Sequence, residues 1–124
     1  MAGTSPGEVV FEDDVCAVIL SISPLTPGHM LVVPRLEVDD LWDLEGEVYE
    51  HVMRVTRNMA RRLEAAYDYA RIGLLVEGFG VPHAHVHVFG YEKPITQTVI
   101  DFTQRTERQV SAERLALAAS RLRR

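Results

Sequence analysis

Short apolar runs separated by turn residues fill the first third of the chain, and this pattern predicts β-strands. Asp13 and Asp14 separate the first two runs as a hairpin turn would. The segment 23–28, with two prolines and one glycine, excludes regular structure before the next run. Strands are therefore expected at 8–12, 15–22, 29–34, 71–77 and 81–90, with a short edge strand at 97–102.

Apolar residues recur at helical spacing through the middle of the chain and predict one long helix, from Gly46 or Glu47 to about Tyr69. Because these positions form a single stripe, the stripe is interpreted as core packing and not as a binding groove. His51 lies beside it and is interpreted as a solvent-facing residue without a role. The stripe consists of Val48, Val52, Val55, Met59, Leu63 and Ala66.

Three of the five histidines, His83, His85 and His87, occupy every second position of the strand expected at 81–90. Successive side chains of a strand point to opposite faces, so these rings are expected on one face, about 7 Å apart. Each ring nitrogen needs a partner and histidine has no strong strand preference, so such a row is a costly way to fill a surface. The row therefore indicates a site for metal binding or phosphate chemistry. The residues between the histidines, Ala84, Val86 and Val88, are expected to point into the core.

Length, composition and charge narrow the class of protein. The 124 residues, 47% of them hydrophobic, suit one domain with a modest core. The longest apolar run, Val15 to Leu20, is far shorter than the roughly 20 residues that span a bilayer, so a soluble protein without a membrane partner is expected. The single cysteine, Cys16, excludes an internal disulfide and fits a cytoplasmic location. The net charge of −5 argues against binding to nucleic acid polymers, so an anionic ligand must be attracted locally.

Two motifs in a fixed order connect these elements to a known family. Residues 83–87 follow the pattern His-x-His-x-His, and the segment 24–34 ends in Pro27-Gly28-His29-Met30-Leu31-Val32-Val33-Pro34. With one long helix between them, the motifs resemble the histidine triad (HIT) family over roughly residues 9–91. The resemblance implies an α+β, HIT-like fold: an antiparallel sheet of about five strands, one long helix and a C-terminal helix. It also implies a homodimer whose activity on nucleotides needs no metal or other cofactor.

The same resemblance suggests how the chain is organised. Residues 1–8 are expected to form a flexible N-terminus and 9–104 the HIT-like domain, on which 105–124 pack as a C-terminal helix. Ser111 is a plausible N-cap for that helix, and Glu113 in its first turn suits the helix dipole.

The resemblance also implies roles for individual residues. His85 would be the nucleophile that takes the nucleoside monophosphoryl group from a nucleotide, and water would later release it. His87 would donate to the phosphate and the leaving atom, His83 would help orient the row, and His29 would complete the polar cluster. His87 stands where related sugar-nucleotide transferases have glutamine, which favours a hydrolase or phosphoramidase. The substrate-binding residues expected on this basis are Ser21, Ile22, Gly80 and Val81.

Three positions depart from the purine phosphoramidases of the family. Ser21 stands where those enzymes have an aspartate for the ribose hydroxyls, and Val76 where they have an asparagine. Their glutamine-serine phosphate loop is shortened to Phe79-Gly80. Backbone N–H groups of Gly80 and Val81 are expected to hold a phosphate oxygen, and no basic side chain nearby in the sequence replaces the lost groups.

Two alternatives stay open beside the hydrolase. The missing polar groups also suit a nucleotide-binding or regulatory protein that keeps the histidines but has little turnover. Alternating histidines also occur as zinc ligands, so His83, His85, His87 and His29 would serve in a metalloprotein. Catalytic zinc sites usually add a carboxylate, and no acidic residue interrupts this row, which makes the metalloprotein the less favoured alternative.

Overall fold

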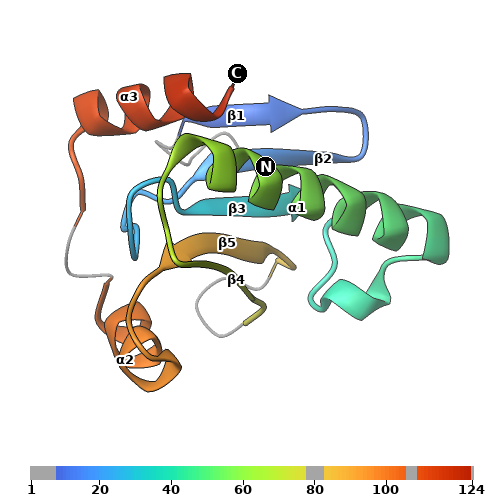
Figure 1. The fold of residues 1–124 in the computed structure, drawn as a ribbon. Coiled ribbons are helices and arrows are strands. Elements are labelled where there is room, and N and C mark those ends of the chain that lie inside the picture. The colour runs from blue at the N-terminus through green and yellow to red at the C-terminus, as the bar shows by residue number, and fades with distance from the viewer. Residues whose placement is uncertain (1–7, 78–82, 106–108, 124) are drawn as a thin grey trace.

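The computed structural model describes residues 8–77, 83–105 and 109–123, which form one antiparallel sheet with helices around it (Figure 1). The strands lie in the order β1-β2-β3-β5-β4, and every neighbouring pair is antiparallel. This arrangement confirms the predicted α+β fold. The strands are β1 (Val9–Glu12), β2 (Cys16–Leu20), β3 (Met30–Pro34), β4 (Arg71–Leu75) and β5 (Val86–Tyr91), and the helices are the short 3₁₀ helix η1 (Leu41–Asp43), α1 (Gly46–Ala66), α2 (Ile95–Gln104) and α3 (Ala112–Leu122).

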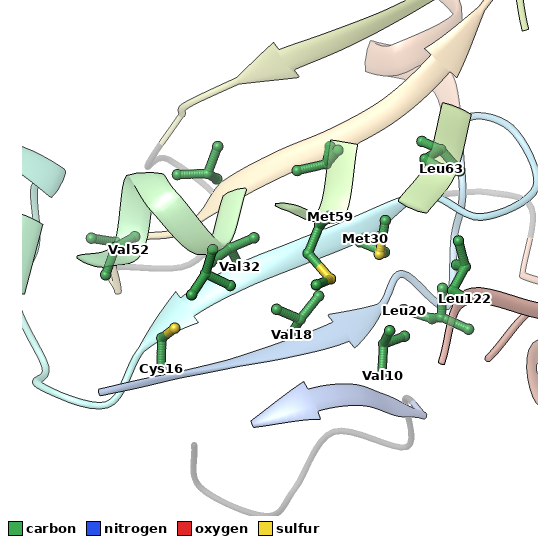
Figure 2. Packing of buried hydrophobic residues seen from close by; sticks show 14 of the residues in the cluster. Val10, Cys16, Val18, Leu20, Met30, Val32, Val52, Met59, Leu63 and Leu122 are labelled. Atoms are coloured by element: carbon green, nitrogen blue, oxygen red, sulfur yellow. The ribbon is translucent and has the colours of Figure 1, made fainter. Parts of the chain in front are cut away.

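The core lies between one face of the sheet and the apolar stripe of α1 (Figure 2). Ala84, Val86 and Val88 belong to it, which confirms the predicted alternation around the histidines. Helix α3 extends the core beside α1 and β1. Within the described ranges no helix is long and apolar enough to cross a membrane. The other core side chains include Cys16, Val18 and Leu20 of β2, Met30 and Val32 of β3, Val52, Val55, Met59 and Leu63 of α1, and Leu115, Ala119 and Leu122 of α3.

The segment 97–102, expected as an edge strand, lies inside α2, so that prediction was wrong. The buried residues of α2 are Thr98 and Phe102, one helical turn apart. A strand would have put Ile100 on the same face as these two, whereas Ile100 is exposed. The helix therefore accounts for the burial pattern, and it directs Phe102 toward the sheet.

Two side-chain hydrogen bonds and one unusual backbone conformation fix the loop in front of His29. The Tyr69 hydroxyl donates to the carbonyl of Pro27 (2.6 Å), and the Thr26 hydroxyl donates to the carbonyl of Gly90 (2.6 Å). Gly28 has a φ of 89°, a conformation that side chains of L-residues rarely adopt. The loop is thus rigid where it delivers His29 to the end of β3.

His51 has a structural role that its position in the sequence did not reveal. Its Nε2 lies 2.6 Å from Oδ2 of Asp13, and the side chain is only half-exposed, so the expectation of a solvent-facing residue without a role was wrong. Oδ1 of Asp13 accepts from the backbone N–H groups of Val15 and Cys16. The pair therefore ties α1 to the β1–β2 hairpin turn.

Gly28→Ala is expected to lower the free energy of unfolding by about 2 kcal/mol or more, because a positive φ and overpacking each cost about 1–3 kcal/mol. A Cβ there would lie 2.7 Å from Cδ1 of Leu63 and 2.9 Å from Cε2 of Tyr67. Gly46→Ala is the matched control, since a Cβ at Gly46 would meet nothing within 4 Å. Urea denaturation of both variants measures the difference, and equal effects would show that the loop before His29 is not constrained.

Candidate active site

Two neighbouring strands bring the histidines together. His87 lies in β5 and pairs across from Leu31 of β3, while His29 directly precedes β3. The ring centroid of His87 is 5.1 Å from that of His29 and 4.8 Å from that of His85, and all three side chains are buried. The structure thus assembles His29, His85 and His87 into one cluster.

His83 lies apart from the regular row that was expected. β5 begins only at Val86, so the prediction of a strand from residue 81 was wrong at its start. Nε2 of His83 lies 2.9 Å from the carbonyl oxygen of Pro34, to which it donates. The imidazole therefore ties this segment to the end of β3.

The position of the proton on His85 follows from its hydrogen bond. Its Nδ1 lies 2.7 Å from the carbonyl oxygen of His83, which can only accept, so Nδ1 carries a hydrogen. In the neutral ring the lone pair is then on Nε2. The backbone of His83, and not its side chain, sets the orientation of this ring.

A second chain of hydrogen bonds determines the tautomers of His29 and His87. The N–H of Leu25 donates to Nδ1 of His29 (2.9 Å), so the proton of His29 is on Nε2. That Nε2 lies 2.9 Å from Nδ1 of His87 and donates to it, which leaves the His87 proton on Nε2. Burial lowers the pKa of His87 to about 3 and holds the pKa of His29 well below its usual 6.5. Both rings are therefore neutral near pH 7.

Nε2 of His87 is buried and has no hydrogen-bond partner among the described residues. Oε2 of Glu77 is 3.8 Å away, too far for a hydrogen bond. One ring nitrogen each of His85 and His87 and one carboxylate oxygen of Glu77 lie within 4.8 Å of one another. An acidic residue thus stands beside the histidines, although none interrupts them in the sequence. The cluster offers a lone pair on His85 and an N–H donor on His87 to one small group.

Comparison with known proteins identifies the family. Residues 2–94 match the family model described as HIT domain. The chain belongs to the HIT domain family. This result confirms the family predicted from the two histidine motifs.

Three similar proteins illustrate the relationship of this HIT protein. An uncharacterized HIT-like protein of Borreliella burgdorferi is 33% identical over 67% of this chain and 65% of its own length. The bifunctional bis(5'-adenosyl)-triphosphatase/adenylylsulfatase FHIT of Arabidopsis thaliana is 26% identical over 67% of this chain and 49% of its own length. The crystal structure of a zinc-bound histidine triad family protein from Mycobacterium smegmatis has a TM-score of 0.71 at 23% identity, covering 98% of this chain and 87% of that one. The match thus spans less than two thirds of the length of the Borreliella and Arabidopsis relatives.

The residues expected to bind substrate in this HIT protein lie in different surroundings. Ser21 is buried, its Oγ accepts from the N–H of Ser23 (3.2 Å), and its own N–H donates to the carbonyl of His29. The carbonyl of Ile22 accepts from the N–H of Val110 (3.1 Å). Gly80 and Val81 lie outside the described residues.

A cavity of about 760 Å³ adjoins Ser21 and His29 between the 24–28 loop and α3. Neither His85 nor His87 lines it. The cavity therefore adjoins the histidine cluster only at His29, on the side of Ser21.

Helix α2 brings two residues to the cluster that the sequence analysis missed. Phe102 is buried with its ring edge-on to His87, at 4.9 Å between centroids. The guanidinium carbon of Arg105 lies 4.1 Å from the centroid of the Phe102 ring. Arg105 is close enough that its charge contributes to the low pKa of both His29 and His87. A basic side chain therefore does stand near the histidines in space, although none was expected near them in the sequence, and the helical spacing of Thr98, Phe102 and Arg105 was the signal that could have revealed it.

Lowering the pH from 7 to 5 is expected to reduce the free energy of unfolding, because His29 and His87 stay neutral when folded but bind protons when unfolded. The stabilisation from His87 is complete above its unfolded pKa of 6.5 and is lost progressively as the pH falls toward its folded pKa of about 3. The slope is at most about 1.4 kcal/mol per pH unit for each histidine. Urea denaturation at pH 7, 6 and 5 should show a shallower slope for His87→Gln than for the parent protein. An unchanged slope would mean that His87 is charged in the folded state.

Proposed function

We propose that this HIT protein is a nucleotide hydrolase or phosphoramidase that attacks the α-phosphate of its substrate through His85, without a metal. The hydrogen bond from Nδ1 of His85 to the carbonyl of His83 carries the proposal, because it leaves a nucleophilic lone pair on Nε2. The N–H of His87 is next to that lone pair and donates to the group under attack. The Arabidopsis relative, a triphosphatase by name, supports a nucleotide as the substrate.

The first step forms a covalent nucleotidyl-histidine. Nε2 of His85 bonds to the α-phosphorus while the bond from phosphorus to the leaving group breaks, and the leaving group departs with that electron pair. His85 keeps its Nδ1 proton, and the carbonyl of His83 stabilises the positive charge that the ring acquires. The N–H of His87 stabilises negative charge on the phosphoryl group.

The second step releases the nucleotide by reaction with water. The water oxygen bonds to phosphorus, the phosphorus–nitrogen bond breaks, and His85 returns to its neutral form. One proton of the water passes to the leaving group or to solvent. His29 acts throughout as a positioning residue, since its Nε2–H holds the proton of His87 on the nitrogen nearer to the phosphate.

A zinc site is the second candidate, favoured by the cluster of Glu77, His85 and His87. Two neutral imidazoles and a carboxylate are a familiar ligand set for catalytic zinc, and the histidine triad family protein from Mycobacterium smegmatis is zinc-bound. His87 would have to give up the proton on Nε2 to act as a ligand. The set of four histidines considered at first is less suitable, because His29 bonds to His87 and the ring of His83 bonds to Pro34. Arg105 opposes a cation here and favours phosphate. One zinc per chain in purified protein, with activity lost on chelation, would favour the zinc site over our proposal.

We also propose a homodimer that forms through β4. This strand is at the edge of the sheet, and Leu74, Leu75 and Val76 are exposed there. Unpaired strand edges with apolar side chains are places where a second chain can pair. A hollow of about 350 Å³ beside the strand, lined by Met53 of α1 among others, extends the apolar surface. A pairing of β4 with its copy would cover both features.

Incubation with a dinucleoside triphosphate is expected to leave a nucleoside monophosphoryl group on His85, detectable by mass spectrometry of an acid-free quench. His85→Ala should abolish the adduct because it removes the nucleophile. His87→Gln should form it about 10²–10³ times more slowly, since one donor to the phosphoryl group is weakened.

The matched control for this experiment is His51→Ala, which removes a histidine outside the cluster. It should form the adduct at the parent rate. Normal hydrolysis by His85→Ala would contradict the proposal. An adduct that forms but is not released would favour the nucleotide-binding or regulatory alternative.

Leu74→Arg is expected to convert a dimer of twice 14.0 kDa into a monomer, because a charge at the β4 edge prevents pairing of two sheets. Light scattering coupled to gel filtration measures the mass, and circular dichroism checks that the fold is retained. Leu117→Arg, at an exposed leucine of α3, is the control and should stay dimeric. A monomeric parent protein would exclude the proposed dimer.

A further inference from the structure

Helix α2 contributes one face to the histidine cluster. Thr98, Phe102 and Arg105 are separated by four and three residues, so one side of the helix and its C-cap residue, Arg105, carry all three. The ring of Phe102 contacts His87 on one side, and the guanidinium of Arg105 lies over the Phe102 ring. Phe102 therefore holds the arginine in place beside the histidines.

Two nitrogen atoms in this region are buried without a partner among the described residues. They are Nε2 of His87 and Nε of Arg105. Both carry a hydrogen, because the His87 tautomer is set by His29 and the guanidinium of arginine has no acceptor. Buried donors left unsatisfied cost about 1–3 kcal/mol each, so such a pair is unusual in a structure without its ligand. A group with several acceptor oxygens would satisfy both.

The charges around these donors favour an anion only because of Arg105. His29 and His87 are neutral, and the carboxylate of Glu77 is 3.8 Å from His87. Glu77 alone would repel a phosphate, as would the net charge of −5. Arg105 interacts with Glu77 and balances it. It thus provides the local positive charge that an anionic ligand of this acidic protein requires.

We infer that Arg105 binds a phosphate group of the nucleotide, together with Nε2–H of His87, and so replaces the polar side chains that are missing from the sequence at Val76 and at Phe79-Gly80. This inference rests on the proposed function, since it assigns the substrate phosphate to the same site. The planar guanidinium offers several donors to phosphate oxygens and stays charged at all relevant pH values. Arg105 is therefore a phosphate-binding residue supplied from outside the histidine motifs.

Titration calorimetry with adenosine monophosphate and with adenosine separates the phosphate contribution from that of the nucleoside. Arg105→Met, which keeps a long side chain over Phe102 but removes the charge, should weaken binding of the monophosphate by about 10- to 100-fold and leave binding of adenosine unchanged. Arg105→Lys keeps the charge but not the paired donors of the guanidinium, so its affinity for the monophosphate should lie between that of the parent protein and that of Arg105→Met. Lys93→Gln removes another cation just before α2 and should bind like the parent protein.

The outcomes also separate this inference from the proposed function. Equal weakening of adenosine and its monophosphate by Arg105→Met, no weakening, or no binding of the monophosphate to the parent protein would overturn the role of Arg105. A phosphate-specific loss would support it, even if no adduct forms on His85 and the proposed function fails. Normal adduct formation on His85 by an Arg105→Met protein with undiminished affinity would leave the proposed function intact and exclude the inference. Circular dichroism of each variant checks that the helices are retained.

Discussion

The hydrogen bond between His29 and His87 is the contact on which the candidate site depends. It joins residues 58 positions apart, and it forms only because β3 and β5 are neighbours in the correct register. Both rings are almost completely shielded from water, so breaking the bond would leave two buried polar groups without partners. The rigid loop before β3 contributes by pointing the N–H of Leu25 at His29. The backbone of the loop before β3 thus determines which ring nitrogen of His87, on β5, carries the proton.

Burial of the His29 and His87 rings affects both their protonation and the stability of the fold. The buried imidazoles of His29 and His87 stay neutral, as neutral hydrogen-bond donors must, but in mild acid these two residues bind protons in the unfolded chain and not in the folded one. The same burial that prepares the histidines therefore makes the fold weaker at low pH. Glu77 and Arg105 add two opposite charges beside these neutral rings.

Much of the fold and part of the site could be predicted from the sequence, because those parts follow from local patterns. Turn residues between apolar runs marked β1 to β4, and the helical stripe marked α1. The segment 97–102 was misjudged because Val99 and Ile100 are β-branched, a feature of strands, while burial of Phe102 against the histidines decides for a helix. The packing joins distant segments, so the β-branched residues gave a stronger local signal than the helical spacing of Thr98 and Phe102.

Part of the site likewise follows from motifs in the sequence, and part only from contacts between distant segments. The family resemblance pointed to His85, His87 and His83, but only the folded chain shows that the ring of His83 bonds to the carbonyl of Pro34. Glu77 comes close to His87 because Leu75 of β4 pairs with His87 of β5, a register that only the assembled sheet defines. The surroundings of Arg105 likewise exist only once α2 has packed.

The boundary of the family match coincides with a boundary in the site. Residues 2–94 match the HIT domain, and α2 begins at Ile95. The histidines thus lie within the matched residues, whereas Phe102 and Arg105 lie beyond them. If His85 and Arg105 act as proposed, then the reaction and the choice of substrate are encoded in separate segments, and substitutions in the second segment would change which phosphorylated molecules bind while the reacting groups stay the same.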